Sequence, residues 1–222
     1  MSLVALIRHA HSEANKNGIL AGRTPGVGLS SDGMSQSHGL VTRLGVFDVK
    51  EIRTSPIERC VQTITPWKDS FPRRIRFVED SDLQEVDYGK WTGRKISALS
   101  RLKAWETVQK KPSEMVFPDG EGLLAMQARA MKAIHRGLKS KGTGVLVVVS
   151  HGDVIKAILS SALGQPFDEF QRIVIDPASV TVIDFGGNKP RVLHMNDSQS
   201  HFEKTLTRSH SHRLLVGGGS GK

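Results

Sequence analysis

The sequence predicts an α/β protein in which helices cover both faces of a mostly parallel central sheet. Short runs rich in Val, Ile and Leu alternate with segments whose apolar residues recur at helical spacing. The most apolar run, Val145–Val149, has the unbroken hydrophobicity of a strand buried on both faces. The 222 residues are few for an eight-unit barrel of about 250 residues, so a three-layer α/β/α sandwich fits better.

The N-terminal half is predicted to form three strands and two helices. In chain order these are a buried strand at 3–7, a helix at 32–44, a short strand at 51–54, a helix opening at Ser55 and a strand at 75–78. Gly45 is expected to end the first helix. Ser55 precedes Pro56 and lies three residues before Glu58, so we expect it to cap the second helix. Pro66 is expected to limit that helix, because proline cannot donate the interior hydrogen bond.

The C-terminal half continues the alternation. It contains a basic helical segment at about 96–110, a helix at 123–138, the strand at 145–149, a return helix at 153–163 and strands at 180–185 and 191–194. The helix at 123–138 is indicated by an apolar residue at every third or fourth position. From Asn196 the composition changes to Ser, Thr, His and Arg, and then to Gly. We therefore predict one domain over residues 1–195 and a flexible tail over 196–222.

The charge balance points to small anionic partners. Lys and Arg number 31 against 22 Asp and Glu, a formal charge of +9, which attracts anions. Dense basic runs are missing and aromatic residues make up 5%, which argues against nucleic acid. The apolar runs fall far short of the ~20 residues of a membrane helix. A single cysteine, Cys60, fits a reducing cytoplasm. We expect a cytoplasmic monomer or homodimer.

Two histidines follow two of the apolar runs in the same way. The run at 3–7 leads into Arg8-His9, and the run at 145–149 leads into Ser150-His151. If both runs are parallel strands, both histidines lie at the carboxyl edge of the sheet, where open α/β sheets bind ligands. A neutral imidazole is a competent nucleophile towards phosphorus, provided that cations and N–H donors surround the phosphoryl oxygens. Arg8 and Arg59 are candidate cations, and a helix starting near Ser12 would add free N–H groups.

Five segments carry a resemblance to a known family. They are Arg8–Asn15, Thr54–Thr63, Leu83–Gly93, Phe117–Glu121 and Ser150–Gly152. In this order they resemble the motifs of the histidine phosphatase superfamily, phosphoglycerate mutase-like branch, and the resemblance covers roughly residues 3 to 195. It implies the phosphoglycerate mutase-like form of the three-layer sandwich. Ala10 departs from the pattern, since it replaces the glycine that is usual next to the first histidine.

The resemblance implies a role for each matching residue. His9 would be the nucleophile that becomes phosphorylated, and Glu85 the acid for the leaving oxygen and later the base for water. Asp87 is the alternative acid. The phosphate-binding residues would be Arg8, Asn15, Arg59 and His151. Lesser contributions to substrate binding are expected from Ser12, Ala21, Gly22 and Gly152. Neither a metal nor a cofactor is implied, since side chains supply the positive charge.

We therefore favour a metal-independent phosphomonoesterase acting through a phosphohistidine on small phosphorylated metabolites. The alternative within the family is a cofactor-dependent, phosphoglycerate mutase-type phosphomutase. Such a mutase excludes water and holds a second anionic group, for which the short segment between Gly93 and Pro118 offers few residues. The residues of this segment that could contact a second anionic group are Arg94, Lys95, Arg101 and Lys103.

Two other classes are weaker. His9-Ala10-His11 is similar to the His-x-His metal pair of amidohydrolase barrels, but the chain is short for that barrel. A module that only binds phosphate has no need of the acid at Glu85.

Overall fold

The structure is a computed structural model that describes residues 2–207. Its strands are β1 (Leu3–Arg8), β2 (Val49–Thr54), β3 (Phe77–Glu79), β4 (Val145–Ser150), β5 (Val180–Asp184) and β6 (Arg191–Asp197). They form one sheet in the order β3-β2-β4-β1-β5-β6. The strands from β3 to β1 run parallel, whereas β5 and β6 are each antiparallel to the preceding strand of the sheet. The predicted mostly parallel sheet is confirmed.

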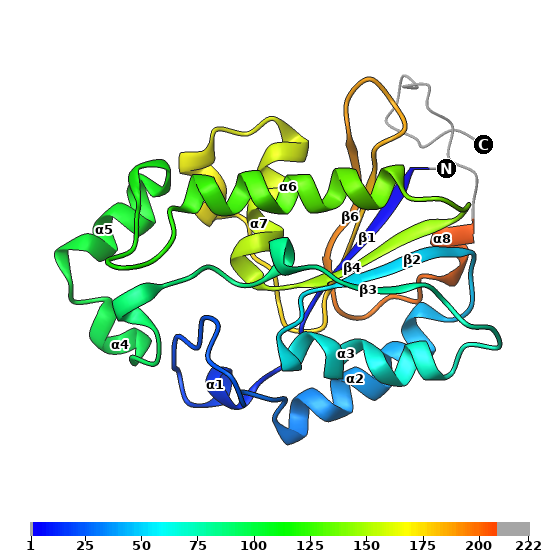
Figure 1. The fold of residues 1–222 in the computed structure, drawn as a ribbon, viewed down its shortest axis with the longest axis horizontal. Helices are drawn as coiled ribbons and strands as arrows, with labels where there is room; N and C mark the ends of the chain where they lie inside the picture. Colours follow the sequence, from blue (N-terminus) through cyan, green and yellow to red (C-terminus); the bar gives the residue numbers. More distant parts are fainter. Residues whose placement is uncertain (1, 208–222) are drawn as a thin grey trace.

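The helices cover both faces of the sheet, which gives the predicted three layers (Figure 1). They are α1 (Glu13–Lys16), α2 (Ser31–Leu44), α3 (Glu58–Asp69), α4 (Ile96–Leu99), α5 (Lys103–Lys110), α6 (Leu123–Lys139), α7 (Gly152–Leu163) and α8 (Glu203–Thr207). Short 3-10 helices lie at Ser81–Leu83, Gly89–Trp91, Pro112–Glu114 and Phe167–Arg172. Helices α2 and α3 pack on one face and α6 and α7 on the other, while α4 and α5 lie beyond the end of the sheet (Figure 1).

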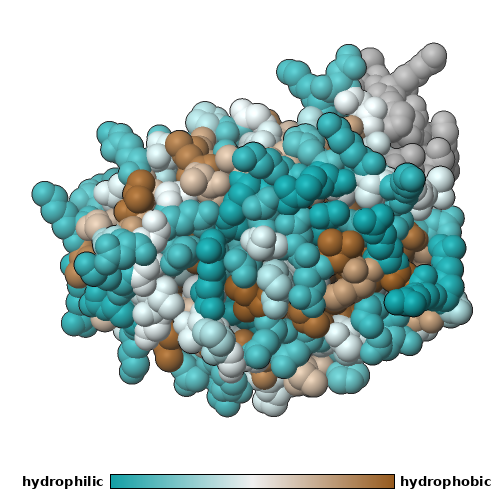
Figure 2. All heavy atoms as spheres, in the orientation of Figure 1, coloured by the Kyte–Doolittle hydropathy of each residue, from teal (hydrophilic) through white to brown (hydrophobic). Residues whose placement is uncertain are grey.

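The alternation of β1 explains why the sheet needs two helical layers. Leu3, Ala5 and Ile7 belong to the apolar cluster beneath α2 and α3. Val4 and Leu6 point the other way, into the cluster formed with α6 and α7, because successive side chains of a strand face opposite sides. Both faces are therefore core, and the surface seen in Figure 2 is largely hydrophilic with small separate apolar patches.

The register of the central strands sets the level of the two histidines. Strand β4 lies between β2 and β1, and Arg8 at the end of β1 pairs with Ser150 at the end of β4. The chain leaves both strands at the same height, so His9 and His151 emerge side by side. Helix α7 starts directly at Gly152 and directs its N-terminus at this edge.

Helix α3 differs from the prediction at both ends. It begins at Glu58 and not at Pro56. The Ser55 hydroxyl accepts from the Ile57 N–H at 3.3 Å and bonds His151 Nε2 at 2.9 Å, and the N-cap residue, Ile57, has no side-chain cap. The helix also continues through Pro66 to Asp69. Pro66 cannot donate to the carbonyl of Gln62, but the Ser37 hydroxyl of α2 donates to that oxygen at 3.0 Å. A tertiary hydrogen bond thus replaces the one that proline removes.

The tail begins later than the composition suggests. Strand β6 continues to Asp197, and α8 follows, with Phe202 and Leu206 buried in the cluster beneath α2 and α3. The apolar pair in a polar sequence is what anchors this segment. The remainder of the predicted tail, residues 208–222, lies outside the described residues. Within residues 2–207, no helix is long and apolar enough to cross a membrane.

Candidate active site

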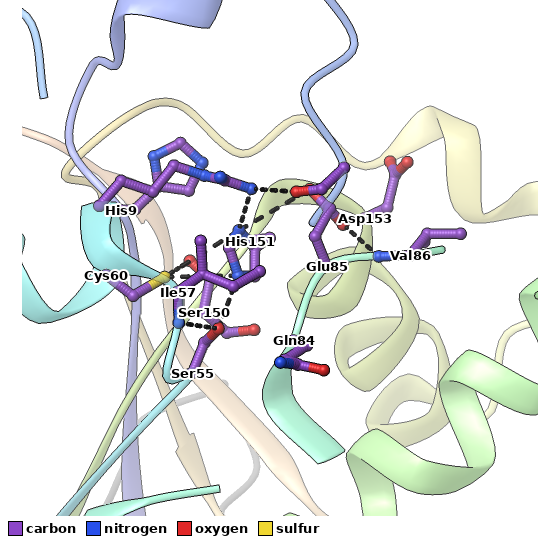
Figure 3. Close-up of polar contacts among 12 residues, drawn as sticks. His9, Ser55, Ile57, Cys60, Gln84, Glu85, Val86, Ser150, His151 and Asp153 are labelled. Carbon is purple, nitrogen blue, oxygen red and sulfur yellow. Dashed lines mark hydrogen bonds and ion pairs between the residues drawn. The ribbon is translucent and has the colours of Figure 1, made fainter. Parts of the chain in front are cut away.

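Two histidines meet at the carboxyl edge of β1 and β4. The backbone N–H of His9 donates to the Ser150 carbonyl at 2.9 Å, which extends the strand pairing by one residue. The rings of His9 and His151 lie edge to face with centroids 5.2 Å apart. Figure 3 shows the His151 ring between His9 and the Glu85 side chain, which approaches from a different segment. The fold thus unites residues that are far apart in the sequence.

The ring of His9 is arranged as a nucleophile. Its Nδ1 lies 2.8 Å from the Ala10 carbonyl, and because a carbonyl only accepts, Nδ1 must carry the proton. The lone pair is then on Nε2. Burial, followed by the charges of Arg59 and Arg8, holds the pKa of His9 well below its usual value. The imidazole is therefore neutral at pH 7, as attack on phosphorus requires.

The ring of His151 is held at both nitrogens. The Arg59 guanidinium donates to Nδ1 from Nη2 at 3.1 Å, so Nε2 carries the proton and donates to the Ser55 hydroxyl at 2.9 Å. Burial and the Arg59 charge lower the pKa of His151 as well. The side chain is fully buried behind Arg59 and does not line the cavity described below.

Two arginines present unpaired N–H groups to the site. Arg59 Nη2 also donates to the Gly22 carbonyl at 2.8 Å, and Arg8 donates to the carbonyl of Ile175. Arg8 Nε and Arg59 Nη1 are buried, and in the part of the chain that the structure describes neither has a hydrogen-bond partner. Buried guanidinium donors without acceptors are costly, unless an anion occupies the space in front of them.

Glu85 is a carboxyl group that holds its proton up to nearly neutral pH. It is 9% exposed, its Oε1 accepts from the Val86 N–H at 3.0 Å, and Oε2 lies 3.9 Å from His151 Nδ1. Burial and then the Asp153 carboxylate raise the pKa of Glu85 to about 7. Such a group can donate a proton at neutral pH and afterwards accept one. The alternative acid, Asp87, has a side chain that is 46% exposed and does not line the cavity.

The loop that carries Glu85 is clamped by Arg129 of α6. Its guanidinium donates to the carbonyls of Asp82, Gln84 and Glu85 at 2.7, 2.7 and 3.1 Å. It also forms two bonds with the Glu121 carboxylate at 2.6 and 2.9 Å. Arg23 donates to the Glu85 carbonyl at 2.9 Å and to Glu121 at 3.0 Å. The acid is therefore positioned by a network of charged hydrogen bonds.

A cavity of about 360 Å³ opens over these groups. It is lined by nine of the ten residues predicted for the site: Arg8, His9, Ser12, Asn15, Ala21, Gly22, Arg59, Glu85 and Gly152. The tenth, His151, lies behind it. Ser12 and Asn15 form a reciprocal cap at the start of α1, with the Ser12 hydroxyl accepting from the Asn15 N–H at 3.2 Å. The cap starts a single helical turn.

Several residues that line the cavity were not predicted from the sequence as site residues. Tyr88, Asp153, Lys156, Gln171 and Asp176 all line the cavity. Asp153 and Lys156 lie three residues apart in the first turns of α7. Because residues three apart share one face of a helix, the helix predicted after the second histidine could have placed both at the cavity. The sequence held no comparable signal for Gln171, which lies in the short 3-10 helix Phe167–Arg172 between α7 and β5.

Cys60 and His11 do not belong to the chemistry of the site. Cys60 Sγ lies 3.5 Å from His151 Nε2, but burial raises the pKa of the thiol to about 12. His11 Nδ1 bonds the Ser30 hydroxyl at 2.8 Å, and the side chain does not line the cavity. The open sheet overturns the amidohydrolase alternative, which requires a closed barrel.

A neutral histidine, two arginines with buried, unpartnered N–H groups and a proton-donating carboxyl group at the edge of an α/β sheet define an enzyme of phosphoryl chemistry. The chain belongs to the histidine phosphatase superfamily (branch 1), whose family model matches residues 4–198.

Similar proteins within this family include mutases and phosphatases. The chain is 31% identical over 185 residues to the 2,3-bisphosphoglycerate-dependent phosphoglycerate mutase of Thermoplasma acidophilum, covering 83% of this chain and 88% of the mutase. It is 25% identical over 204 residues to phosphoserine phosphatase 1 of Hydrogenobacter thermophilus, covering 88% and 92%. The solved structure of Bacillus stearothermophilus YhfR superposes with a TM-score of 0.82 at 24% identity, covering 90% of this chain and 99% of that one, and so shares the fold.

Proposed function

We propose that the protein is a metal-independent phosphomonoesterase that hydrolyses small phosphate monoesters through a phosphohistidine at His9. The observation that carries the proposal is a single cavity holding both halves of the reaction. One side has the Nε2 lone pair of His9 and the unpaired N–H groups of Arg8 and Arg59. The other side has Glu85, whose pKa is raised to about 7.

The first half-reaction breaks the ester. Arg8, Arg59 and the Asn15 amide bind the phosphoryl oxygens, and His151 keeps Arg59 in place from behind. Nε2 of His9 attacks phosphorus, the bond to the ester oxygen breaks, and Glu85 gives its proton to that oxygen so that an alcohol leaves.

The second half-reaction restores the enzyme. The Glu85 carboxylate takes a proton from water, whose oxygen attacks phosphorus and breaks the N–P bond. Inorganic phosphate leaves, and both side chains return to their starting protonation states. The acid and the base are thus the same group, which a pKa near neutrality permits.

The alternative is a cofactor-dependent phosphomutase, and the similarity to the Thermoplasma acidophilum mutase favours it. Hydrolysis is better supported by the cavity. Ile96 lines it, whereas the basic residues considered for a second anionic group do not; these are Arg94, Lys95, Arg101 and Lys103. Lys156 does line it, but the Asp153 carboxylate lies 3.3 Å from its ammonium. A second phosphate or carboxylate would meet little net positive charge there.

The free, buried thiol of Cys60 supports a cytoplasmic location for this activity. The partner that we propose is the small phosphorylated substrate.

Trapping the intermediate tests the mechanism. With radiolabelled substrate, the wild-type enzyme should give an acid-labile, base-stable adduct, and His9→Ala should give none. Persistence of the adduct in His9→Ala would contradict the assignment of the nucleophile.

A second measurement separates hydrolase from mutase. The enzyme is mixed with 3-phosphoglycerate and 2,3-bisphosphoglycerate, and 2-phosphoglycerate and free phosphate are followed together. Release of phosphate from simple monoesters without a bisphosphate primer supports the hydrolase. Isomerisation much faster than phosphate release would make the protein a mutase with the same site residues.

A further inference from the structure

A second cavity of about 260 Å³ adjoins the catalytic one. Six residues line both cavities and form the border between them: Leu20, Tyr88, Ile96, Asp153, Lys156 and Gln171. The residues found only around the second cavity are mainly apolar and include Trp91, Trp105, Val108 and Phe117.

The position of Glu85 shows which part of a substrate would point towards the second cavity. Because Glu85 protonates the ester oxygen, the leaving alcohol lies on the Glu85 side of the phosphoryl group. The Asp153 carboxylate is close enough to Glu85 to raise its pKa, and Tyr88 donates to Asp153 at 2.8 Å. Tyr88 and Asp153 are two of the residues that border both cavities. The leaving group is therefore directed at the junction between them.

Four polar side chains form a collar at this junction: Tyr88, Asp153, Lys156 and Gln171. Lys156 Nζ lies 3.3 Å from Asp153 Oδ1 and 3.1 Å from Gln171 Oε1, and its side chain is 19% exposed. Gln171 Nε2 in turn donates to the Val108 carbonyl at 3.3 Å. An ammonium has three N–H donors, so Lys156 can still donate to an oxygen acceptor on a passing substrate.

The walls beyond the collar are aromatic. The rings of Trp91 and Trp105 stack with centroids 6.1 Å apart and an interplanar angle of 15°. Phe117 packs edge-on against Trp91 at 5.3 Å and against Tyr88 at 4.9 Å. Aromatic faces and edges favour a further ring in offset or edge-to-face contact. An apolar cavity of about 150 Å³ is enough to bind benzene, so one ring fits the space available.

We propose that the second cavity is a leaving-group subsite that takes the ring of an aromatic or cyclic apolar alcohol. The substrates of this class are phosphate monoesters whose alcohol carries a ring one or two bonds from the ester oxygen, with an oxygen acceptor in reach of Lys156 as a favourable addition. The proposal rests on the proposed phosphatase function and narrows it, since it selects substrates by the leaving group.

Benzyl phosphate and ethyl phosphate test this proposal. Both esters release primary alkoxides that need protonation, but only the benzyl ester carries a ring. In the wild-type enzyme we expect kcat/KM to be at least about tenfold higher for the benzyl ester, the discrimination that apolar contacts of this size give. Trp105→Ala removes part of the wall, and Val108→Phe fills the cavity; both should lower the benzyl-to-ethyl ratio about fivefold or more. Leu163→Ala, an exposed apolar truncation at the far end of α7, should leave the ratio unchanged.

A binding measurement separates the subsite from the reaction. Benzylphosphonate and ethylphosphonate cannot be hydrolysed, and their dissociation constants are measured by titration calorimetry on the wild type and the same variants. Tighter binding of benzylphosphonate that is lost in Trp105→Ala or Val108→Phe supports the subsite, even if neither ester is turned over. Hydrolysis of both esters with a ratio near one, or a ratio that neither cavity variant moves, would overturn the subsite and leave the phosphatase function standing.

Discussion

The ends of β1 and β4 are built alike and are used differently. Each strand runs into a histidine at the same level of the sheet, yet His9 keeps one ring nitrogen free whereas His151 engages both. The difference comes from neighbours outside the strands, namely Arg59 and Ser55, which are placed by β2 and α3. The strand pattern therefore fixes where a histidine lies, and its hydrogen-bond partners decide what it can do.

The largest predicted effect contrasts the two histidines. His9→Ala should abolish the phosphoenzyme and lower kcat/KM by about 10⁴-fold or more, the scale of losing a nucleophile. His151→Ala leaves the nucleophile but removes the acceptor that holds Arg59, so a loss of about 10²–10³-fold is expected. Steady-state kinetics and trapping on both variants measure the contrast. Equal losses, with no adduct in either variant, would mean that His151 is as close to the chemistry as His9.

The next largest effect distinguishes the role of Glu85 as an acid from the binding of the phosphoryl group by the arginines. Glu85→Gln should lower kcat/KM for an alkyl phosphate by about 10²–10⁴-fold, because an alkoxide must be protonated as it departs. The loss for a nitrophenyl phosphate should be much smaller, since that group leaves unassisted. Similar losses for both esters would move the acid role to another residue, with Asp87 as the first to examine.

The pH dependence of the rate tests whether Asp153 raises the pKa of Glu85. The pKa of Glu85 is raised to about 7, and the acid must be protonated to act. The rate with alkyl esters should therefore fall as the pH rises through about 7. Asp153→Asn removes the negative charge that helps to raise this pKa, so the fall should move to lower pH. An unshifted profile in Asp153→Asn would show that burial alone sets the pKa.

The clamp on the acid loop gives a smaller effect. Arg129→Lys keeps the charge but loses the planar fork that spans three carbonyls and Glu121. We expect kcat for an alkyl ester to fall about tenfold while that for a nitrophenyl ester changes little. Equal reductions for the two esters would indicate general disorder of the site in place of a misplaced acid.

The last predicted effect is on the stability of the fold and leaves the reaction aside. Folding raises the pKa of Glu85, so the folded state keeps a proton that the unfolded state loses first. This contribution to stability is complete below the ordinary glutamate pKa and is lost as the pH rises through about 7. Glu85→Gln should therefore raise Tm relative to the wild type by about 7–14 °C more at pH 8 than at pH 4, because the shift of this pKa corresponds to about 3 kcal/mol. Thermal denaturation at both pH values measures it, and a difference that does not change with pH would refute the linkage.

The sequence was most informative where periodicity and strand ends decide the outcome. Alternating runs predicted the sheet and its two helical layers, and the residues after β1 and β4 predicted the edge where the cavity lies. It was least informative where a distant partner decides. Ser55 was expected to cap α3, but its hydroxyl bonds His151 as well as the Ile57 N–H, and α3 begins only at Glu58. Pro66 is tolerated because Ser37 from another helix replaces the missing donor. Such exchanges leave no local pattern.

The burial of α8 has a practical consequence for expressing this protein. Phe202 packs into the apolar cluster beneath α2, and its backbone N–H donates to the Arg43 carbonyl at 2.7 Å. The change in composition at Asn196 suggests truncating the chain at residue 195. Such a truncation would remove Phe202 and Leu206 and expose the apolar side chains that they cover. Exposed apolar surface of this kind promotes aggregation. The shortest useful recombinant fragment therefore extends at least to Thr207.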